Sequence, residues 1–246
     1  MTNGNLFEGA MALITGANKG IGYEIARGLG AKNIMVLVGA RDEVRGNAAA
    51  TKLKNEGVDA RFVQLDVTNK DTITKAARWI EDQFGHLDIL VNNAGIAEWG
   101  FKPSNADLAK VREVYETNLF GPIAVTQAML PLLHRSKRGR IVNVSSALGS
   151  LASTSDPRSP TSQFLALGYN TSKSALNAMT VQFANELRAT PIKVNAICPG
   201  YCATDINNHS GPRTAAQGAV AAVRYATIGD DGPTGGLFDE DGPVAW

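Results

Sequence analysis

The stretch Thr15-Gly16-Ala17-Asn18-Lys19-Gly20-Ile21-Gly22 decides the fold of this 246-residue chain. The apolar run Met11–Thr15 leads into it, and Gly20–Leu29, which has helical spacing of apolar residues, follows. Glycines in such a strand-to-helix turn let the backbone approach a pyrophosphate, and the N-terminus of the helix attracts the anion. The stretch therefore predicts a phosphate cradle made by Gly16, Asn18, Lys19, Gly20, Ile21 and Gly22. A plain turn that uses glycine only for its positive φ is the alternative.

Short apolar runs alternate with longer amphipathic stretches along the rest of the chain, which is typical of βα units. The predicted strands are Met11–Thr15, Ile34–Gly39, Arg61–Gln64, Ile89–Asn92, Arg140–Ser145 and Ile192–Cys198, with one more near Gly236–Phe238. The predicted helices are Gly20–Leu29, Arg45–Asn55, Thr72–Phe84, Asp107–Arg135 with a bend near Pro122, Gly168–Leu187 and Thr214–Ala226. Almost wholly apolar strands belong in a parallel sheet covered on both faces. We predict an α/β fold, a Rossmann-like doubly wound parallel sheet flanked by helices on both faces, as one domain over residues 1–246.

Charge and composition exclude several function classes. Lys and Arg number 24 against 23 Asp and Glu, so the net charge of +1 draws the chain to neither nucleic acid nor anionic membrane. No apolar run approaches the roughly 18–20 residues of a membrane span, and the N-terminus lacks the pattern of a signal peptide. We therefore expect a cytoplasmic protein without a nucleic-acid or membrane partner. Because His86, His134 and His209 are isolated in the sequence, no metal site is expected.

The end of the second predicted strand bears on the choice of cofactor. A site for NAD places a carboxylate about here, where it accepts hydrogen bonds from the ribose hydroxyls. This chain has Gly39-Ala40-Arg41-Asp42 instead, with the carboxylate one residue late. Arg41, Arg45 and Lys19 are three cations that can converge on a 2′-phosphate, and guanidinium groups bind phosphate bidentately. We therefore expect NADP(H), with a solvated helix start as the alternative for these residues.

Further motifs follow the glycine-rich turn in a fixed order. They are Asp66-Val67, Asn92-Asn93-Ala94-Gly95, Asn118, Ser145-Ser146, Tyr169-Asn170-Thr171-Ser172-Lys173 and Pro199-Gly200. With the turn itself they resemble the short-chain dehydrogenase/reductase family over nearly all of the chain. Within that family, Asn18–Gly22, Ala40–Asp42 and Cys198–Asp205 are most similar to NADPH-dependent carbonyl reductases.

The resemblance implies three further groups of cofactor contacts, at the adenine, at the ribose and at the nicotinamide. In that order they are Asp66 with Val67, then Asn93, Ala94 and Gly95, then Thr204 with the preceding Pro199 and Gly200. An ordinary strand-end turn is the alternative for Asn92–Gly95, because Asn and Gly favour such positions.

Tyr169 and Lys173 are four residues apart on a predicted helix, so both side chains lie on one face. A nearby cation favours tyrosinate, so Lys173, joined by the charge of the oxidised nicotinamide, is expected to move the pKa of Tyr169 down toward working pH. In the reductive direction we predict that a hydride leaves C4 of NADPH for the carbonyl carbon and that Tyr169 protonates the growing alkoxide. An exposed helical pair is the alternative.

The resemblance implies three supporting roles around this acid. Ser146, chosen over Ser145 by the family pattern, is expected to donate a hydrogen bond to the same substrate oxygen. Lys173 is also expected to bind the nicotinamide ribose, and Asn118 to anchor a water that connects Lys173 to solvent.

Ser146 and Tyr169 are 23 residues apart, which is longer than the common spacing in the family. The extra residues lie in the Ser-, Thr- and Pro-rich segment 148–167, expected with 205–212 to be the least regular part of the chain and a candidate lid. Some carbonyl reductases carry a still longer insertion here and are monomers, so a monomer is favoured over a homo-oligomer.

The substrate pocket is expected from residues after Gly95, in the insertion and after Gly200. The candidates, mostly apolar, are Ile96, Trp99, Leu148, Phe164, Tyr201 and Ile206. Such a lining favours ketones or aldehydes with hydrophobic or aromatic substituents, with core packing as the alternative for any one of these residues.

Three functional hypotheses stand at this point. The first is an NADPH-dependent reductase of small ketones and aldehydes. The second is a narrow-substrate dehydrogenase of the same family, acting on a sugar, a steroid or an acyl thioester. The third is a non-catalytic NADP-binding regulator, against which the full set Asn118, Ser146, Tyr169 and Lys173 argues.

Overall fold

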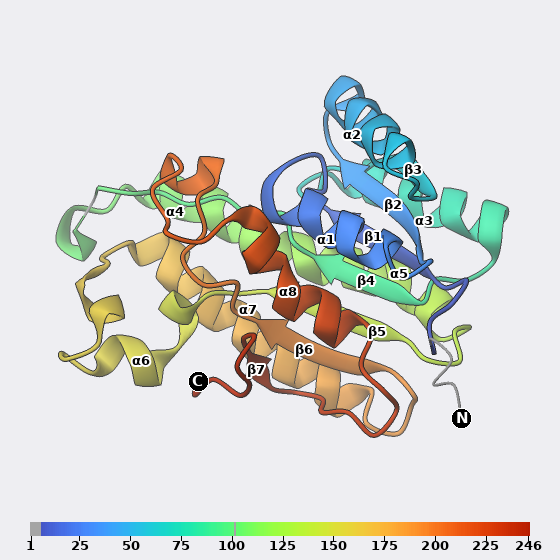
Figure 1. Cartoon of the computed structure of the whole chain (residues 1–246). Coiled ribbons are helices and arrows are strands. Elements are labelled where there is room, and N and C mark those ends of the chain that lie inside the picture. Colours follow the sequence, from blue (N-terminus) through green and yellow to red (C-terminus); the bar gives the residue numbers. More distant parts are fainter. Residues whose placement is uncertain (1–5, 101) are drawn as a thin grey trace.

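Seven parallel strands form one sheet in the computed structural model, which describes residues 6–100 and 102–246. The strands are β1 (Met11–Thr15), β2 (Met35–Ala40), β3 (Ala60–Gln64), β4 (Ile89–Asn92), β5 (Arg140–Val144), β6 (Lys193–Ile197) and β7 (Leu237–Phe238). Their order in the sheet is β3-β2-β1-β4-β5-β6-β7, so the chain builds outward from β1 in one direction and then from β4 in the other (Figure 1). This confirms the predicted α/β fold and puts the point where the strand order reverses between β1 and β4.

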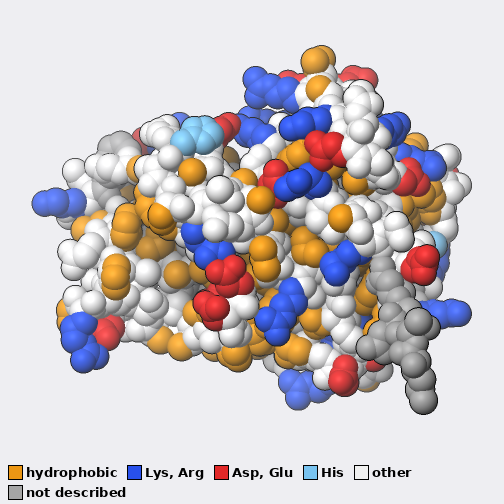
Figure 2. Space-filling model, in the orientation of Figure 1, with side chains coloured by type: hydrophobic (Ala, Val, Ile, Leu, Met, Phe, Trp, Pro, Cys, Tyr) orange, Lys and Arg blue, Asp and Glu red, His pale blue; other side chains and the backbone are white. Residues whose placement is uncertain are grey.

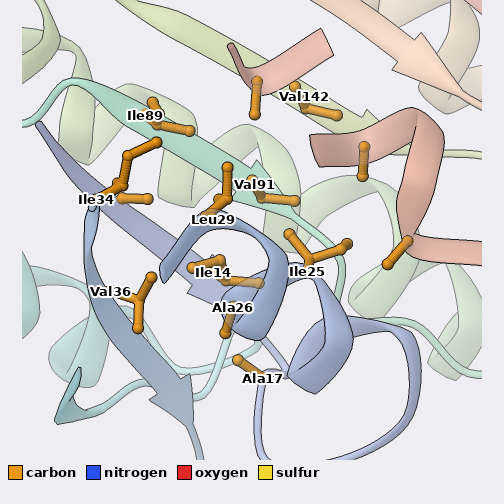
Figure 3. Packing of buried hydrophobic residues seen from close by; sticks show 14 of the residues in the cluster. Ile14, Ala17, Ile25, Ala26, Leu29, Ile34, Val36, Ile89, Val91 and Val142 are labelled. Carbon is orange, nitrogen blue, oxygen red and sulfur yellow. The ribbon is translucent and has the colours of Figure 1, made fainter. Parts of the chain in front are cut away.

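Helices cover both faces of the sheet (Figure 1). On one face lie α1 (Gly20–Gly30), α2 (Glu43–Asn55) and α8 (Ala215–Ala226), and on the other α3 (Lys70–Phe84), α5 (Gly121–Leu133) and α7 (Leu167–Glu186), with α4 (Leu108–Tyr115) beside α7. Neighbouring strand residues alternate between the two cores, as Leu13 and Ile14 of β1 show. In Figure 3, α1 lays Ile25 and Leu29 over Ile14. Burial on both faces explains why the strands are almost wholly apolar.

Local capping residues set where several helices begin. The Asp42 carboxylate accepts from the backbone N–H of Arg45 at the start of α2, and the Asn69 side chain does the same for the first turn of α3. Gly85, with φ of +75°, ends α3 in the left-handed conformation that glycine adopts without strain. The strands agree with the predicted ranges within one residue, and the helices outside 107–135 agree within two.

The helix predicted over 107–135 with a bend near Pro122 is a continuous helical run with an interruption just before that proline. The structure has α4, then a wide π turn over Glu116–Phe120, then α5, and Pro122 lies in the first turn of α5. The departure from α geometry centres on Asn118, whose buried side chain bonds the backbone of Ile96. The interruption therefore lies where Pro122 has no N–H to offer the Asn118 carbonyl oxygen, and the hydrogen bonds to Ile96 hold the Asn118 side chain there.

The segment 148–167 is more regular than its composition predicts. It contains the short helix α6 (Leu151–Ser155) and a 3₁₀ turn over Pro160–Gln163. Hydroxyl groups hold these pieces together, since the Ser153 hydroxyl lies 2.8 Å from that of Thr161. The segment thus has short turns in place of a long helix or strand, and side-chain hydrogen bonds order it where the apolar periodicity of longer helices is missing. Within the described ranges, no helix combines the length and apolar character that a membrane span requires.

The core between α1 and the sheet generates a stability prediction. Leu29 is fully buried there, so Leu29→Ala removes apolar contacts and leaves a cavity. We expect a loss of about 2–5 kcal/mol in the free energy of unfolding, measured by urea titration. The control is Val44→Ala, at a side chain 80% exposed on α2, for which a change within about 0.5 kcal/mol is expected. Equal losses for the two variants would contradict the packing described here.

Candidate active site

The loops that follow β1 and β4 are joined by hydrogen bonds at the point where the strand order reverses. The Thr15 hydroxyl oxygen accepts from the backbone N–H groups of Asn93 and Ala94, each at 3.0 Å. The Asn93 side-chain amide donates in return to the Thr15 carbonyl oxygen at 2.9 Å. Ligands of open parallel sheets bind in the crevice at this point. These bonds therefore form the floor of the candidate site.

Two glycines of the predicted cradle have no room for a side chain. A Cβ on Gly16, whose φ is +65°, would lie 3.0 Å from the Ala94 Cα, and one on Gly22 would lie 2.4 Å from the Asn93 side-chain nitrogen. Lys19, the residue before α1, gives that helix no side-chain cap. The first turn of α1 thus keeps N–H donors for an anion, and the cradle fits the pyrophosphate of a dinucleotide.

The residues expected at the two ends of a dinucleotide flank this cradle. Asp66 follows β3, and its Oδ1 accepts from the backbone N–H and the hydroxyl of Thr68, at 2.9 and 2.7 Å. Val67 beside it is buried. On the other side, the Thr204 methyl carbon lies 3.7 Å from where a Cβ on Gly20 would stand. The loop after β6 therefore packs against the glycine-rich turn.

The three cations predicted to hold a 2′-phosphate come from two segments, the glycine-rich turn and the residues after β2. Arg41 follows β2 and Arg45 lies in the first turn of α2, a region where Lys and Arg side chains collect on the surface (Figure 2). Lys19 instead pairs with Asp205, which lies beyond β6 on the opposite side of β1. Asp205 thus pairs with the Lys19 ammonium, and the convergence of Lys19 with the two arginines on a 2′-phosphate stays a prediction.

Tyr169 and Lys173 of α7 lie against the end of β5. Lys173 Nζ is 5.6 Å from the centroid of the Tyr169 ring and donates to the Val144 carbonyl oxygen at 2.8 Å. Ser146, two residues beyond Val144, is hydrogen-bonded to Tyr169. A Cβ on Gly95 would lie 3.6 Å from Lys173 Nζ, so the loop after β4 closes the site from the other side. The structure thus brings Ser146, Tyr169 and Lys173 together beside the cradle.

Burial shifts the titration of both catalytic candidates. Desolvation raises the pKa of Tyr169 to about 12, although the hydrogen bond with Ser146 acts in the opposite direction. Desolvation also lowers the pKa of Lys173 to about 8. Among the protein's own groups, burial of the phenol sets the direction of this shift, and the expected lowering by Lys173 together with an oxidised nicotinamide stays a prediction. At neutral pH, Tyr169 carries a proton and Lys173 a positive charge.

The two adjacent serines have different surroundings. Ser145 is buried, and its hydroxyl donates to the Asn177 side-chain oxygen at 2.6 Å. The Ser146 hydroxyl accepts from the Leu148 backbone N–H at 3.1 Å and remains half-buried at the edge of the site. Ser145 is thus part of the core, whereas Ser146 faces Tyr169.

Asn118 is fully buried in the π turn between α4 and α5. Its side-chain oxygen accepts from the Ile96 N–H and its amide donates to the Ile96 carbonyl oxygen, both at 2.9 Å. The amide also lies 3.1 Å from the Ser172 hydroxyl, between the catalytic candidates on α7. The side chain therefore ties the loop after β4 to α7, and the water that Asn118 is expected to anchor stays a prediction.

Three segments bring apolar side chains to the mouth of the site. The Trp99 ring packs on Tyr169 with centroids 5.3 Å apart, and its indole N–H donates to the Ile206 carbonyl oxygen at 2.6 Å. Phe164 of the insertion meets Tyr201 with centroids 6.0 Å apart. Among the predicted pocket residues, Leu148 is half-buried and Ile96, Trp99, Phe164 and Tyr201 are exposed. Hydrophobic side chains are exposed over the α6 side of the molecule (Figure 2).

Two carboxylates, which the sequence patterns did not single out, complete the site. Glu98 Oε1 accepts from the backbone N–H groups of Gly168 and Tyr169. Asp205 binds Lys19 and also lies 2.9 Å from the His209 ring nitrogen; the hydrogen bond from Lys19 holds the pKa of Asp205 below its usual range. Asp205 directly follows a predicted cofactor residue, which is a weak signal. The Glu98 contact depends on loop packing and has no signal in the sequence.

Other constellations lie apart from this chemistry. A groove of about 840 Å³ runs between α1 and α8, on the side of the sheet away from α7. Cys198 and Cys202 are buried free thiols, and burial raises the pKa of each. The described residues contain no group of three or more His, Cys, Asp or Glu side chains able to hold a metal ion.

Comparisons with known proteins agree with this geometry. A family model described as short chain dehydrogenase matches residues 10–215. (−)-Isopiperitenone reductase of Mentha piperita is 34% identical, with 95% of this chain and 97% of that protein covered. Salutaridine reductase of Papaver bracteatum is 35% identical, with 93% of each chain covered. The solved structure of an NADPH-bound carbonyl reductase from chicken fatty liver is 28% identical, with a TM-score of 0.85 over 97% of this chain and 100% of that one.

The lowered pKa of Lys173 predicts how stability depends on pH. Its folded-state pKa is about 8, against 10.5 for the free side chain, so between these values the unfolded chain binds more protons and stability rises with pH. Relative to Lys173→Met, we expect the wild-type free energy of unfolding to gain roughly 2 kcal/mol between pH 8 and pH 10. Urea titrations of both proteins across this range measure the difference. The titration of Tyr169 contributes to the free energy of unfolding of both proteins and cancels in the comparison. A difference between the two proteins that stays constant with pH would contradict a desolvated Lys173 ammonium.

Proposed function

This chain belongs to the short-chain dehydrogenase family and is an oxidoreductase, and we propose that it is an NADPH-dependent carbonyl reductase. The proposed reaction converts ketones and aldehydes into alcohols. The observation that carries the proposal is the meeting of Ser146, Tyr169 and Lys173 beside a glycine cradle that fits a dinucleotide. The printed names of its relatives, which are reductases including one bound to NADPH, support the same class of reaction.

The cradle supports binding of the cofactor through named backbone and side-chain groups. The N-terminus of α1 would face the pyrophosphate, with Asp66 toward the adenine and Thr204, which lies near Gly20, toward the nicotinamide. Arg41 and Arg45 would bind the 2′-phosphate of NADPH, since both are exposed cations after β2 where a carboxylate would select NAD. Bound there, the nicotinamide supplies the hydride.

Tyr169 is the proposed proton donor. Its raised pKa keeps the phenol protonated at neutral pH, which is the state that an acid for an alkoxide requires. Ser146 shares a hydrogen bond with the phenol and would donate to the same substrate oxygen, as a preorganised oxyanion donor does. The proton of Tyr169 would pass to the alcohol oxygen, and solvent would then restore it to the phenol.

Lys173 and Asn118 would support this transfer without touching the substrate oxygen. Lys173 keeps its charge at neutral pH, so it would stabilise the transient tyrosinate and bind the nicotinamide ribose. Asn118 holds Ile96, which follows the ribose-binding loop, and would anchor the water that connects Lys173 to solvent.

The mouth of the site supports apolar or aromatic carbonyl substrates. Ile96, Trp99, Phe164 and Tyr201 expose large side chains there, and such surfaces bind apolar ligands in preference to charged ones. The segment 148–167, which contributes Phe164, would lie over the helix face that other family members use to associate, so we propose a monomer.

Tyr169→Phe tests the reaction. Against a panel of activated ketones, aryl aldehydes and β-keto esters, we expect wild-type turnover with NADPH and a loss of about 10²–10⁴-fold in kcat for the variant, because the phenol supplies the proton. NADPH affinity should stay within about twofold, since only the hydroxyl is removed. Loss of nicotinamide absorbance measures turnover. A largely active variant would overturn the assignment of the acid, whereas wild-type silence with intact NADPH binding would favour a narrow-substrate dehydrogenase or a regulator.

Arg41→Asp tests the choice of cofactor. Removing the guanidinium and adding a carboxylate should weaken NADPH about 10²-fold or more, because a charge-assisted bond to the 2′-phosphate is replaced by repulsion. NADH, which lacks that phosphate, should lose little affinity or gain some. Titration of nucleotide fluorescence measures both dissociation constants. Arg188→Asp, which makes the same charge change beyond the far end of α7, is the control; equal losses of NADPH and NADH in Arg41→Asp would mean that the phosphate is held elsewhere.

A further inference from the structure

The carboxylate of Glu98 reaches from the loop after β4 to the N-terminus of α7. Its Oε1 accepts from the backbone N–H of Gly168 at 2.5 Å and from that of Tyr169 at 3.2 Å. The second bond belongs to the backbone of the proposed proton donor itself. The other oxygen, Oε2, is buried and has no hydrogen-bond partner among the described residues.

The 20-residue helix α7 depends on this distant acceptor because its own sequence offers none. The residue at the capping position is Ala166, whose side chain has no acceptor. The first N–H groups of a helix need partners, and a negative charge there is stabilised by the helix dipole. Gly168 makes the approach possible, since a Cβ at that position would lie 2.8–3.0 Å from the Glu98 carboxylate.

Other helices of the chain are capped locally. Asp42, Asn69, Asp107 and Thr214 each accept from N–H groups in the first turn of the helix that follows them. A cap of that kind stabilises a helix without joining it to anything else. The cap of α7 instead comes from the loop that also carries Asn93, Ala94 and Gly95, so it ties the helix with Tyr169 to the loop proposed to hold the nicotinamide ribose.

We propose that Glu98 is a positioning residue that sets where the proton donor Tyr169 stands relative to the hydride donor. The inference rests on the proposed function, because it assigns a purpose to the link between these two loops. Neighbouring contacts complete the restraint: Trp99, the next residue, packs on the Tyr169 ring at 5.3 Å between centroids, and Ser146 holds the phenol. Glu98 therefore fixes the backbone of the acid while Trp99 and Ser146 fix its ring.

Three variants at Glu98 distinguish the effect of side-chain length from that of the negative charge. Glu98→Ala removes the acceptor, Glu98→Asp keeps the charge on a side chain one methylene shorter, and Glu98→Gln keeps an oxygen at the same reach. We expect Ala and Asp to lower kcat about 10–10²-fold while KM and Kd for NADPH stay within about twofold, because a displacement of about 1 Å at the reacting groups costs this much. Gln should keep kcat within about threefold.

Amide hydrogen exchange gives a readout that does not depend on turnover. The peptide that covers 167–173 should exchange faster in the Ala and Asp variants and at the wild-type rate in the Gln variant. The control is Asp107→Ala, which removes the local cap of α4, a bond from the Ala109 backbone N–H to the Asp107 carboxylate. It should lower Tm by about 2–4 °C, as one lost cap does, and leave kcat and the exchange of 167–173 unchanged.

Each outcome decides the proposal. Wild-type kcat and exchange in the Asp variant would overturn it, and so would a Gln variant as impaired as the Asp variant, because Gln keeps an acceptor oxygen at the same reach. If Glu98→Ala does not fold, the Asp and Gln pair still decides. If the wild type reduces no carbonyl of the panel, the proposed function fails, and the exchange rates alone still show whether Glu98 holds Tyr169.

Discussion

The contact between the loops after β1 and β4 is the constraint on which the rest of the site depends. Thr15 and Asn93 exchange hydrogen bonds there. The two loops come so close that Gly16 and Gly22 have no room for a Cβ. Neighbouring strands of a sheet lie about 4.8 Å apart, so the loops that leave adjacent strand ends begin close together. Here they are bound together, and the cradle, the loop to Glu98 and the N-terminus of α7 all take their positions from this junction.

A second constraint is the burial of charge next to the acid. Lys173 is 4% exposed, and its Nζ has one backbone acceptor, Val144. Burial disfavours the charged form of each group, so the pKa of the Lys173 ammonium falls and that of the Tyr169 phenol rises. The two shifts bring the pKa of the Lys173 ammonium closer to neutral pH and move the pKa of the Tyr169 phenol further from it. Low dielectric at this point strengthens every remaining charge interaction, including one with the proposed oxidised nicotinamide.

Sequence patterns predicted the parts of the structure that depend on local chemistry. Strand ends agree within one residue because the apolar runs end near Gly, Asn, Asp or Ser, and Tyr169 with Lys173 share a helix face because of their spacing. The features that the patterns do not predict involve contacts between distant segments. The Asn118 side chain bonds Ile96, Lys19 pairs with Asp205, and burial, which no residue pattern reports, raises the pKa of Tyr169.

The position of the segment 148–167 at the mouth of the site also depends on hydrogen bonds to distant parts of the chain. The insertion that carries Phe164 is anchored at its start, where the Ser150 hydroxyl donates to the Ala245 carbonyl oxygen and the Ala152 N–H to that of Trp246. Its end is fixed by Asn170 of α7, which donates to the Phe164 carbonyl oxygen at 2.8 Å. Both anchors are polar and accept on backbone carbonyl oxygens, and they hold Phe164 where its ring meets that of Tyr201. Under the proposed function, Tyr169 and Ser146 would hydrogen-bond the carbonyl oxygen of the substrate. The aromatic rings at the mouth would contact the rest of the substrate through apolar surface.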